Sequence, residues 1–369
     1  MKLLDRYILK QFLSTFIFVV LILLAVISVI DVTEKADKYA KANLSAIQVL
    51  GYYADFLPWI AGLVTPITVF IATVYVTARL AGRTEIIAML SSGVSFRRLL
   101  APYFMGALLI ASVSFYLNGW VIPNSNKTRL AFEMDYLNKA GNPNLRNIHL
   151  QIAPNTFIYI QSYNNLTDKG YQFTLEHFEN NRLIEKLTAN RIEWDTAKSK
   201  WTLRDWKLKK IDVVFEMVSQ DSAKKITEQI TSGLALDTTL IIHPKEFKND
   251  YRKYDGLTIS ELDDYIQTLR SRGSAGIEVY AVEKYTRYAS PFSIFILTFM
   301  GVIVSSRKSR GGTGFQIALG FLLSFVFILF FMMFRTFAEA GSMPPQISVW
   351  IPSIVFALLS MFMYKYVPR

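Results

Sequence analysis

The chain has 369 residues, of which 52% are hydrophobic, and it carries a formal net charge of +11. It contains no cysteine and three widely spaced histidines, so a disulfide scaffold is excluded and a zinc site is disfavoured. The positive charge gives little support to nucleic-acid binding, because nearly all of it lies in short segments beside long apolar stretches.

Six apolar stretches without a charged residue or histidine divide the chain into three spans, an insert and three more spans. They cover residues 12–30, 56–78, 99–122, 288–306, 311–334 and roughly 340–364. A helix rises about 1.5 Å per residue, so about 20 residues cross a hydrocarbon core about 30 Å thick. The predicted fold is a polytopic α-helical membrane protein with six transmembrane helices.

The charges beside the predicted spans differ sharply between the two sides of the membrane. One set of termini and short loops holds twelve basic and two acidic residues, and the opposite loops hold four basic and five acidic residues. Basic residues near span ends are retained in the cytoplasm. The sequence therefore predicts cytoplasmic N- and C-termini, with residues 1–122 and 288–369 in the membrane part and residues 123–287 outside.

The loop between the second and third spans, residues 79–98, predicts a short helix at the membrane surface. Thr84 is placed to cap this helix and Gly93 to end it. Three apolar residues share one of its faces: Ile86, Met89 and Leu90. Such a helix would present Arg83 and Glu85 to a cytosolic partner, although an interfacial amphipathic turn without a partner explains the periodicity equally well.

After Pro123 the composition changes to short alternating segments that are typical of strands. Turn signals separate these segments at 154–155, 180–181 and 195–198. Many short strands at close spacing predict an inserted all-β domain, a sandwich or a jelly roll. One helix, about 258–272, is predicted within the insert, because Thr258 and Glu261 form a capping-box pattern and Gly273 follows.

No catalytic constellation or energy source is found in the sequence. The glycine-rich segment 310–314 lacks the lysine of a phosphate-binding loop and fits a tight turn between two spans. A proton or sodium relay is disfavoured, because the six spans carry no ionisable residue of the kinds that such relays use. Trp194, Trp201 and Trp206 favour cross-strand packing over a sugar- or lipid-binding face.

Two motifs and the overall plan resemble a known family. The opening Leu4-Asp-Arg-Tyr-Ile8, the loop Arg83-Thr-Glu-Ile-Ile-Ala-Met-Leu-Ser-Ser-Gly93 and the three-plus-three arrangement around an external β domain resemble the LptF/LptG permeases of lipopolysaccharide export. The likeness covers essentially the whole chain. The loop motif is the more specific of the two, and the opening motif favours the LptG branch over the LptF branch.

The resemblance implies a permease subunit of an ABC transporter in the inner membrane of a Gram-negative bacterium, and not an enzyme. It implies a sister LptF/LptG permease as heterodimer partner, an LptB-type ATPase dimer and an LptC-type partner of a periplasmic jelly-roll domain. No cofactor is expected in this chain, since ATP and Mg²⁺ belong to the ATPase. The family's coupling helix falls on residues 82–98, with Glu85 as its acidic contact and Arg83, Ile86 and Met89 beside it.

The cargo implied by the resemblance is lipopolysaccharide, extracted from the outer leaflet and passed toward the outer membrane. Its phosphates need cations at the outer surface, and four residues are placed for this role: Lys35, Lys38, Lys41 and Arg335. Asp31 departs from the family pattern, which favours a basic residue there, so Lys38 matches best. A solvated mixed-charge helix end remains an alternative to a phosphate clamp.

Two other functions fit the same sequence. A permease for another lipid, such as a phospholipid, shares every feature and differs only in cargo. A membrane-anchored periplasmic binding or scaffold protein would use the spans only as an anchor. Six spans are more than an anchor requires, and the cytosolic loop would then lack a purpose.

Overall fold

The computed structural model describes residues 3–137, 144–164, 167–196, 198–218, 221–240, 242–244, 253–274, 276–306 and 312–365. The chain divides into two compact units. The helical unit holds Met1–Asn138, Tyr254–Asp263 and Glu278–Arg369, and the sheet unit holds Lys139–Lys253 and Asp264–Ile277. The segment 307–311, which includes the first two residues of the glycine-rich segment 310–314, lies outside the described residues, and residues 312–314 begin a helix.

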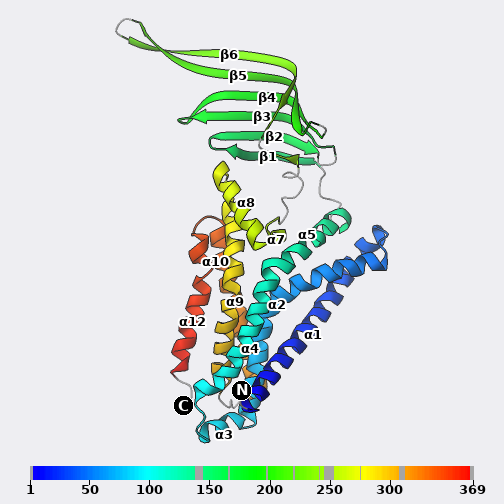
Figure 1. Cartoon of the computed structure of the whole chain (residues 1–369), viewed down its shortest axis with the longest axis vertical. Coiled ribbons are helices and arrows are strands. Elements are labelled where there is room, and N and C mark those ends of the chain that lie inside the picture. Colours follow the sequence, from blue (N-terminus) through cyan, green and yellow to red (C-terminus); the bar gives the residue numbers. More distant parts are fainter. Residues whose placement is uncertain are drawn as a thin grey trace. The chain divides into compact units, whose positions relative to one another are not determined.

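The six predicted spans are confirmed as helices that are long and apolar enough to cross a membrane (Figure 1). They are α1 (Leu3–Lys41), α2 (Ala46–Gly82), α4 (Phe96–Tyr116) with its extension, α9 (Ile277–Ser305), α10 (Gly312–Glu339), and α12 (Ile351–Tyr364), which follows the short α11 (Pro345–Ser348). The longest helices continue well past the apolar stretches, because polar residues also form helical hydrogen bonds once the chain leaves the hydrocarbon.

The third span continues far beyond its apolar stretch as one helical column. A π-helical turn, η1 (Leu117–Val121), joins α4 to α5 (Ile122–Phe132), and a second π turn, η2 (Glu133–Leu137), follows. The column passes close to α2, since a Cβ atom added at Gly62 would lie 2.8 Å from the side chain of Ile122. The sequence boundaries at 122 and 287 lie inside continuous helices, and the helical unit runs to Asn138, takes in Tyr254–Asp263 and continues from Glu278.

The largest apolar core of the helical unit joins α1, α2, α4 and α9 with a short helix, α3 (Glu85–Ser91). Ile8 and Phe12 of α1 are almost completely buried in it. Gly106 of α4 allows α1 to approach, because a Cβ atom at this position would lie 2.6 Å from the ring of Phe12. Small residues at such crossings are typical of helix packing in membranes.

The insert is confirmed as an all-β domain whose six strands form one antiparallel sheet in sequential order. The strands are β1 (Asn144–Ala153), β2 (Thr156–Asn164), β3 (Lys169–Glu179), β4 (Arg182–Asp195), β5 (Lys200–Val218) and β6 (Asp221–Thr238). Among the described residues, β1 and β6 are not paired with each other, so the sheet is not closed. Asn180 and Asn181 both have positive φ, which confirms the tight hairpin predicted between β3 and β4.

An aligned irregularity crosses the whole sheet. One residue in each strand takes no part in the regular pairing with the neighbouring strands, and these residues lie opposite one another. These residues, all exposed, are Asn147, Gln161, Gln172, Asn190, Asp205 and Leu234. Beyond this row the alternation between the two faces shifts by one residue, so that Ile158 and Ile160 are buried on one side of it and Tyr163 on the other. Unpaired residues of this kind bend a strand.

One face of the sheet carries the apolar core of its unit, built from alternate residues of all six strands. Trp201 is completely buried there, and its indole Nε1 donates to the carbonyl of Ile242 at 2.8 Å, which confirms packing for this tryptophan.

The predicted helix is present as α8 (Ile259–Arg272). Its capping box is confirmed, since the Thr258 amide donates to Glu261 and the Glu261 amide donates to the Thr258 hydroxyl.

Candidate functional site

The short helix α3 lies at the end of the helical unit where α1 begins and α12 ends (Figure 1). Thr84 precedes α3 but makes no side-chain cap, because it adopts φ 61° and its hydroxyl donates to the carbonyl of Arg83. Gly93 has φ 86°, as predicted for the residue that ends the helix. The amides of Gly93 and Val94 donate to Leu90 and Met89, which satisfies the last carbonyls of α3.

The apolar face of α3 packs inward. Ile86 is 2% exposed in the core with α1, α2 and α4, and Met89 and Leu90 pack against the same core. Ile86, which the sequence placed at the partner contact, thus lies in this core, and its side chain has almost no surface left to offer a partner. Ile87 is 53% exposed on another face of α3, and the sequence reading had missed this residue.

Glu85 begins α3 and is held from two sides. The hydroxyl of Tyr7 in α1 donates to its Oε2 atom at 3.4 Å, and a guanidinium nitrogen of Arg83 lies 3.9 Å from its Oε1 atom. The Glu85 side chain is 28% exposed and that of Arg83 is 55% exposed. A partly exposed carboxylate of fixed position, beside an exposed guanidinium, can receive a cationic group from another protein.

Lys35 lies near the other end of α1 and contacts residues of α1 and α2. Its Nζ atom lies 2.8 Å from a carboxylate oxygen of Asp31 and donates to the hydroxyl of Tyr52 at 2.7 Å. Tyr52 donates in turn to Glu133 of η2, and Tyr53 donates to Asp31. The charge of Lys35 is therefore largely compensated within the helical unit. Asp31, the residue that departs from the family pattern, supplies this compensation and also accepts a hydrogen bond from Tyr53.

Arg335 is compensated in the same manner. It lies 3.1 Å from Glu283 of α9 and 2.7 Å from Glu339 of its own helix, and its side chain is 27% exposed. Glu283 also contacts Arg287 at 3.1 Å, and Arg287 donates to the backbone carbonyls of Tyr254 and Leu257. This network was not predicted from the sequence, where its local signals are the spacings of four residues between Glu283 and Arg287 and between Arg335 and Glu339.

Lys38 and Lys41 differ from these two residues, because both are exposed in the last turns of α1. The structure thus divides the four predicted phosphate contacts. Lys38 and Lys41 lie close together on one helix and face outward, whereas Lys35 and Arg335 are each paired with carboxylates.

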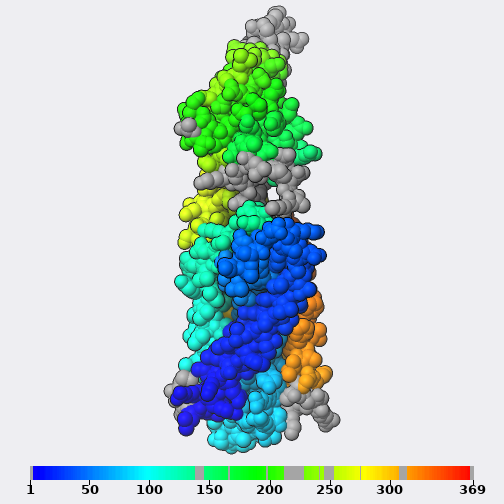
Figure 2. All heavy atoms as spheres, turned by 90° about the vertical axis from the view of Figure 1, so that its right-hand side faces the viewer, coloured from blue at the N-terminus to red at the C-terminus, as the bar shows by residue number. Residues whose placement is uncertain are grey.

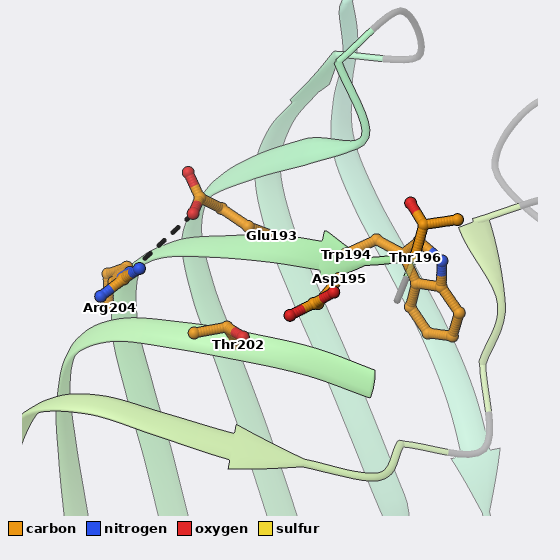
Figure 3. Close-up of a pocket in the computed structure, with 6 residues that line it drawn as sticks. All are labelled: Glu193, Trp194, Asp195, Thr196, Thr202 and Arg204. Atoms are coloured by element: carbon orange, nitrogen blue, oxygen red, sulfur yellow. Dashed lines mark ion pairs between the residues drawn. The ribbon is translucent and has the colours of Figure 1, made fainter. Parts of the chain in front are cut away.

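The sheet unit has a polar hollow of about 390 Å³ over β4 and β5, lined by Glu193, Trp194, Asp195, Thr196, Thr202 and Arg204 (Figure 3). Its charges are internally paired: Glu193 contacts Arg191 at 3.0 Å, Lys169 at 3.3 Å and Arg204 at 3.8 Å. Beside it, a hydrogen bond from Lys198 lowers the pKa of Asp237. No group of three metal-binding side chains occurs in the part of the chain that the structure describes.

Comparison with known proteins gives one consistent result. The family model described as "Lipopolysaccharide export system permease LptF/LptG" matches residues 6–366. The lipopolysaccharide export system permease protein LptG of Escherichia coli K12 is 20% identical over 361 residues, which cover 98% of this chain and 97% of that protein. The LptG protein of Haemophilus influenzae is 20% identical over 359 residues, covering 96% of each chain.

Proposed function

The chain belongs to the LptF/LptG family of lipopolysaccharide export permeases, and from this premise we propose that it couples ATP hydrolysis by a partner to the extraction of lipopolysaccharide from the inner membrane. The observation that carries the proposal is the extent of the match, which includes both sets of spans and the inserted sheet. In this proposal a sister permease completes the transporter, an LptB-type ATPase supplies the energy and an LptC-type protein joins the β domain.

The proposal assigns the end of the helical unit that carries α3 to the cytoplasm. The charge asymmetry of the loops supports this orientation, because the basic side includes Arg79, Arg83, Arg97 and Arg98 around α3. The pair of the exposed Arg83 and the partly exposed Glu85 supports α3 as the contact with the ATPase. ATP and Mg²⁺ would bind that partner and not this chain.

Large apolar surfaces suit a cargo with several acyl chains. No residue is buried in the most apolar window of α1, and α10 exposes Phe315, Phe321 and Phe325. Figure 2 shows α1 lying uncovered across one face of the helical unit. Apolar area of this size is favourable only against lipid or another protein, so these surfaces would face the acyl chains of the cargo, the bilayer and the sister permease.

We expect Lys38 and Lys41 to contact the phosphates of the cargo. Replacing both by glutamate should lower photo-crosslinking of lipopolysaccharide from position 40 by at least about tenfold, since each lysine near an anionic lipid surface contributes about 1 kcal/mol. Asp37→Asn, an exposed change on the same turns, serves as the control and should leave crosslinking unchanged or higher. If the double variant crosslinks as strongly as the wild type, these lysines do not contact the cargo.

The cargo itself is tested by mass spectrometry of the lipid that copurifies with the complex in mild detergent. Lipopolysaccharide enriched together with a stoichiometric ATPase supports the proposal. A phospholipid enriched in its place would make the chain a permease for another lipid, and recovery of the chain without any ATPase would favour the scaffold function.

A further inference from the structure

The opening motif, Leu4 to Ile8, carries side chains that the proposed function leaves without a role. In the structure Asp5 and Ile8 are 5% and 1% exposed, although they lie in the first turns of the first helix. Arg6, between them, is exposed. A buried carboxylate needs a partner, because a buried charge is costly unless it is paired.

Asp5 is paired with Arg98, at 2.5 Å from a guanidinium nitrogen. Arg98 is the third residue of α4, and its amide donates to the capping hydroxyl of Ser95. Arg98 therefore lies in the first turn of the helix that follows α3 in the chain. The Asp5 side chain is 8% exposed and that of Arg98 is 43% exposed, so a partly solvated guanidinium compensates a buried carboxylate. Removing Arg98 would leave that buried charge without its ionic partner.

Tyr7 contacts the same segment at its beginning. Its hydroxyl donates to Glu85, the first residue of α3, at 3.4 Å. Ile86 packs in the core that also contains Ile8 and Phe12. The first turns of α1 thus contact the first residue of α3, the buried face of α3 and the start of α4.

The middle of α1 lacks comparable anchoring. No residue of its most apolar window is buried, whereas Asp5, Ile8 and Phe12 are buried near its start and Tyr39 near its end. A displacement of α3 therefore reaches α1 chiefly through the contacts at its first turns, since packed side chains move together and exposed ones do not.

We propose that Asp5, through Arg98, and Tyr7, through Glu85, are positioning residues that hold α3 against α1, so that α1 moves when α3 is displaced. The proposal rests on the proposed function only in naming the ATPase as the source of that displacement. The position of α3 itself can be measured without transport.

The first experiment measures the position of α3 by thiol labelling, because the chain has no cysteine of its own. Ile86→Cys is introduced into the full chain in the assembled complex and labelled with a water-soluble maleimide. Asp5→Asn should raise the labelling rate at least about fivefold, a common size for coupling between sites. Asp5→Arg combined with Arg98→Asp should return it toward the wild-type rate, and Arg6→Gln, in the same motif, should not change it.

A second buried position distinguishes displacement of α3 from general loosening. Leu262→Cys, completely buried in α8, should label at the same slow rate with and without Asp5→Asn. Equal rises at positions 86 and 262, or no rise at position 86, would overturn the proposal.

The second experiment measures lipid released per ATP hydrolysed by complexes reconstituted in vesicles. Asp5→Asn should lower this ratio at least about fivefold, while the amount of chain in the membrane stays at the wild-type level. An unchanged ratio overturns the coupling role. Failure of the wild-type complex to release lipid would count against the proposed function, and the labelling result would still decide whether Asp5 positions α3.

Discussion

Replacing Glu85 by lysine is expected to lower the amount of ATPase that copurifies with the chain by at least about tenfold, with insertion into the membrane unchanged. Truncating one partner of a charge pair at an interface costs about 2–5 kcal/mol, and 1.4 kcal/mol corresponds to a tenfold change in affinity. Charge reversal adds repulsion, since the new ammonium would lie beside Arg83 and would face any cation of the ATPase. Quantitative copurification in mild detergent measures the effect.

Glu85→Gln separates the charge from the position of the side chain. Glutamine keeps an oxygen that can accept from Tyr7, so α3 should stay in place while the ionic contact is lost. An intermediate loss of ATPase is expected. Ile87→Ala should also weaken association, because this side chain is 53% exposed, whereas Ile86→Ala should chiefly lower stability by leaving a cavity. Wild-type recovery of the ATPase with Glu85→Lys would exclude α3 as the coupling contact.

The spans and the local turns could be predicted because their causes lie within a few neighbouring residues. Apolar length alone determines which segments can cross a membrane. The capping box at Thr258 and Glu261 and the paired positive φ angles at Asn180 and Asn181 depend on residues at most three positions apart. Gly93 ends α3 for the same kind of reason.

The candidate site could be predicted only in part, because part of its contacts join distant positions of the chain. Asp31 and Glu339 lie four residues from the cations that they pair with, but Tyr52 and Glu283, which also contact Lys35 and Arg335, lie 17 and 52 residues away. Asp5 and Arg98 are 93 residues apart in sequence. The inward direction of Ile86 likewise depends on α1 and α4, so periodicity identified the apolar face of α3 but not what covers it.

The row of unpaired residues across the sheet was also beyond the sequence. Asn147 and Asp205 tolerate positive φ and could have indicated an irregular strand, but Gln172 has the same backbone conformation without that preference. The register of the strands is determined only when all six strands pair with one another. Because the alternation shifts at this row, regular alternation in each strand covers only a short segment, and the sequence accordingly predicted short strands.

Replacing Glu283 by glutamine is expected to lower the free energy of unfolding by about 3–5 kcal/mol, the usual cost of removing one partner of a buried ionic network. Glu283 lies between Arg287 and Arg335 and contacts both at 3.1 Å. Arg287 is 4% exposed, so its charge would lose its carboxylate where water cannot replace it. Unfolding in mixed micelles of increasing dodecyl sulfate content measures the change.

Glu339→Gln is the matched control, since it removes the other carboxylate of Arg335. That pair lies within α10 with side chains 27% and 31% exposed, and pairs of this type contribute about 0.3–0.5 kcal/mol. The two variants should therefore differ several-fold in their effect on stability. Equal effects would mean that Glu283 is better solvated than its contacts indicate, and Arg335 would then again be available to an anionic lipid. A large difference would instead assign Arg335 to holding α9 and α10 together, and leave Lys38 and Lys41 as the cations for the cargo.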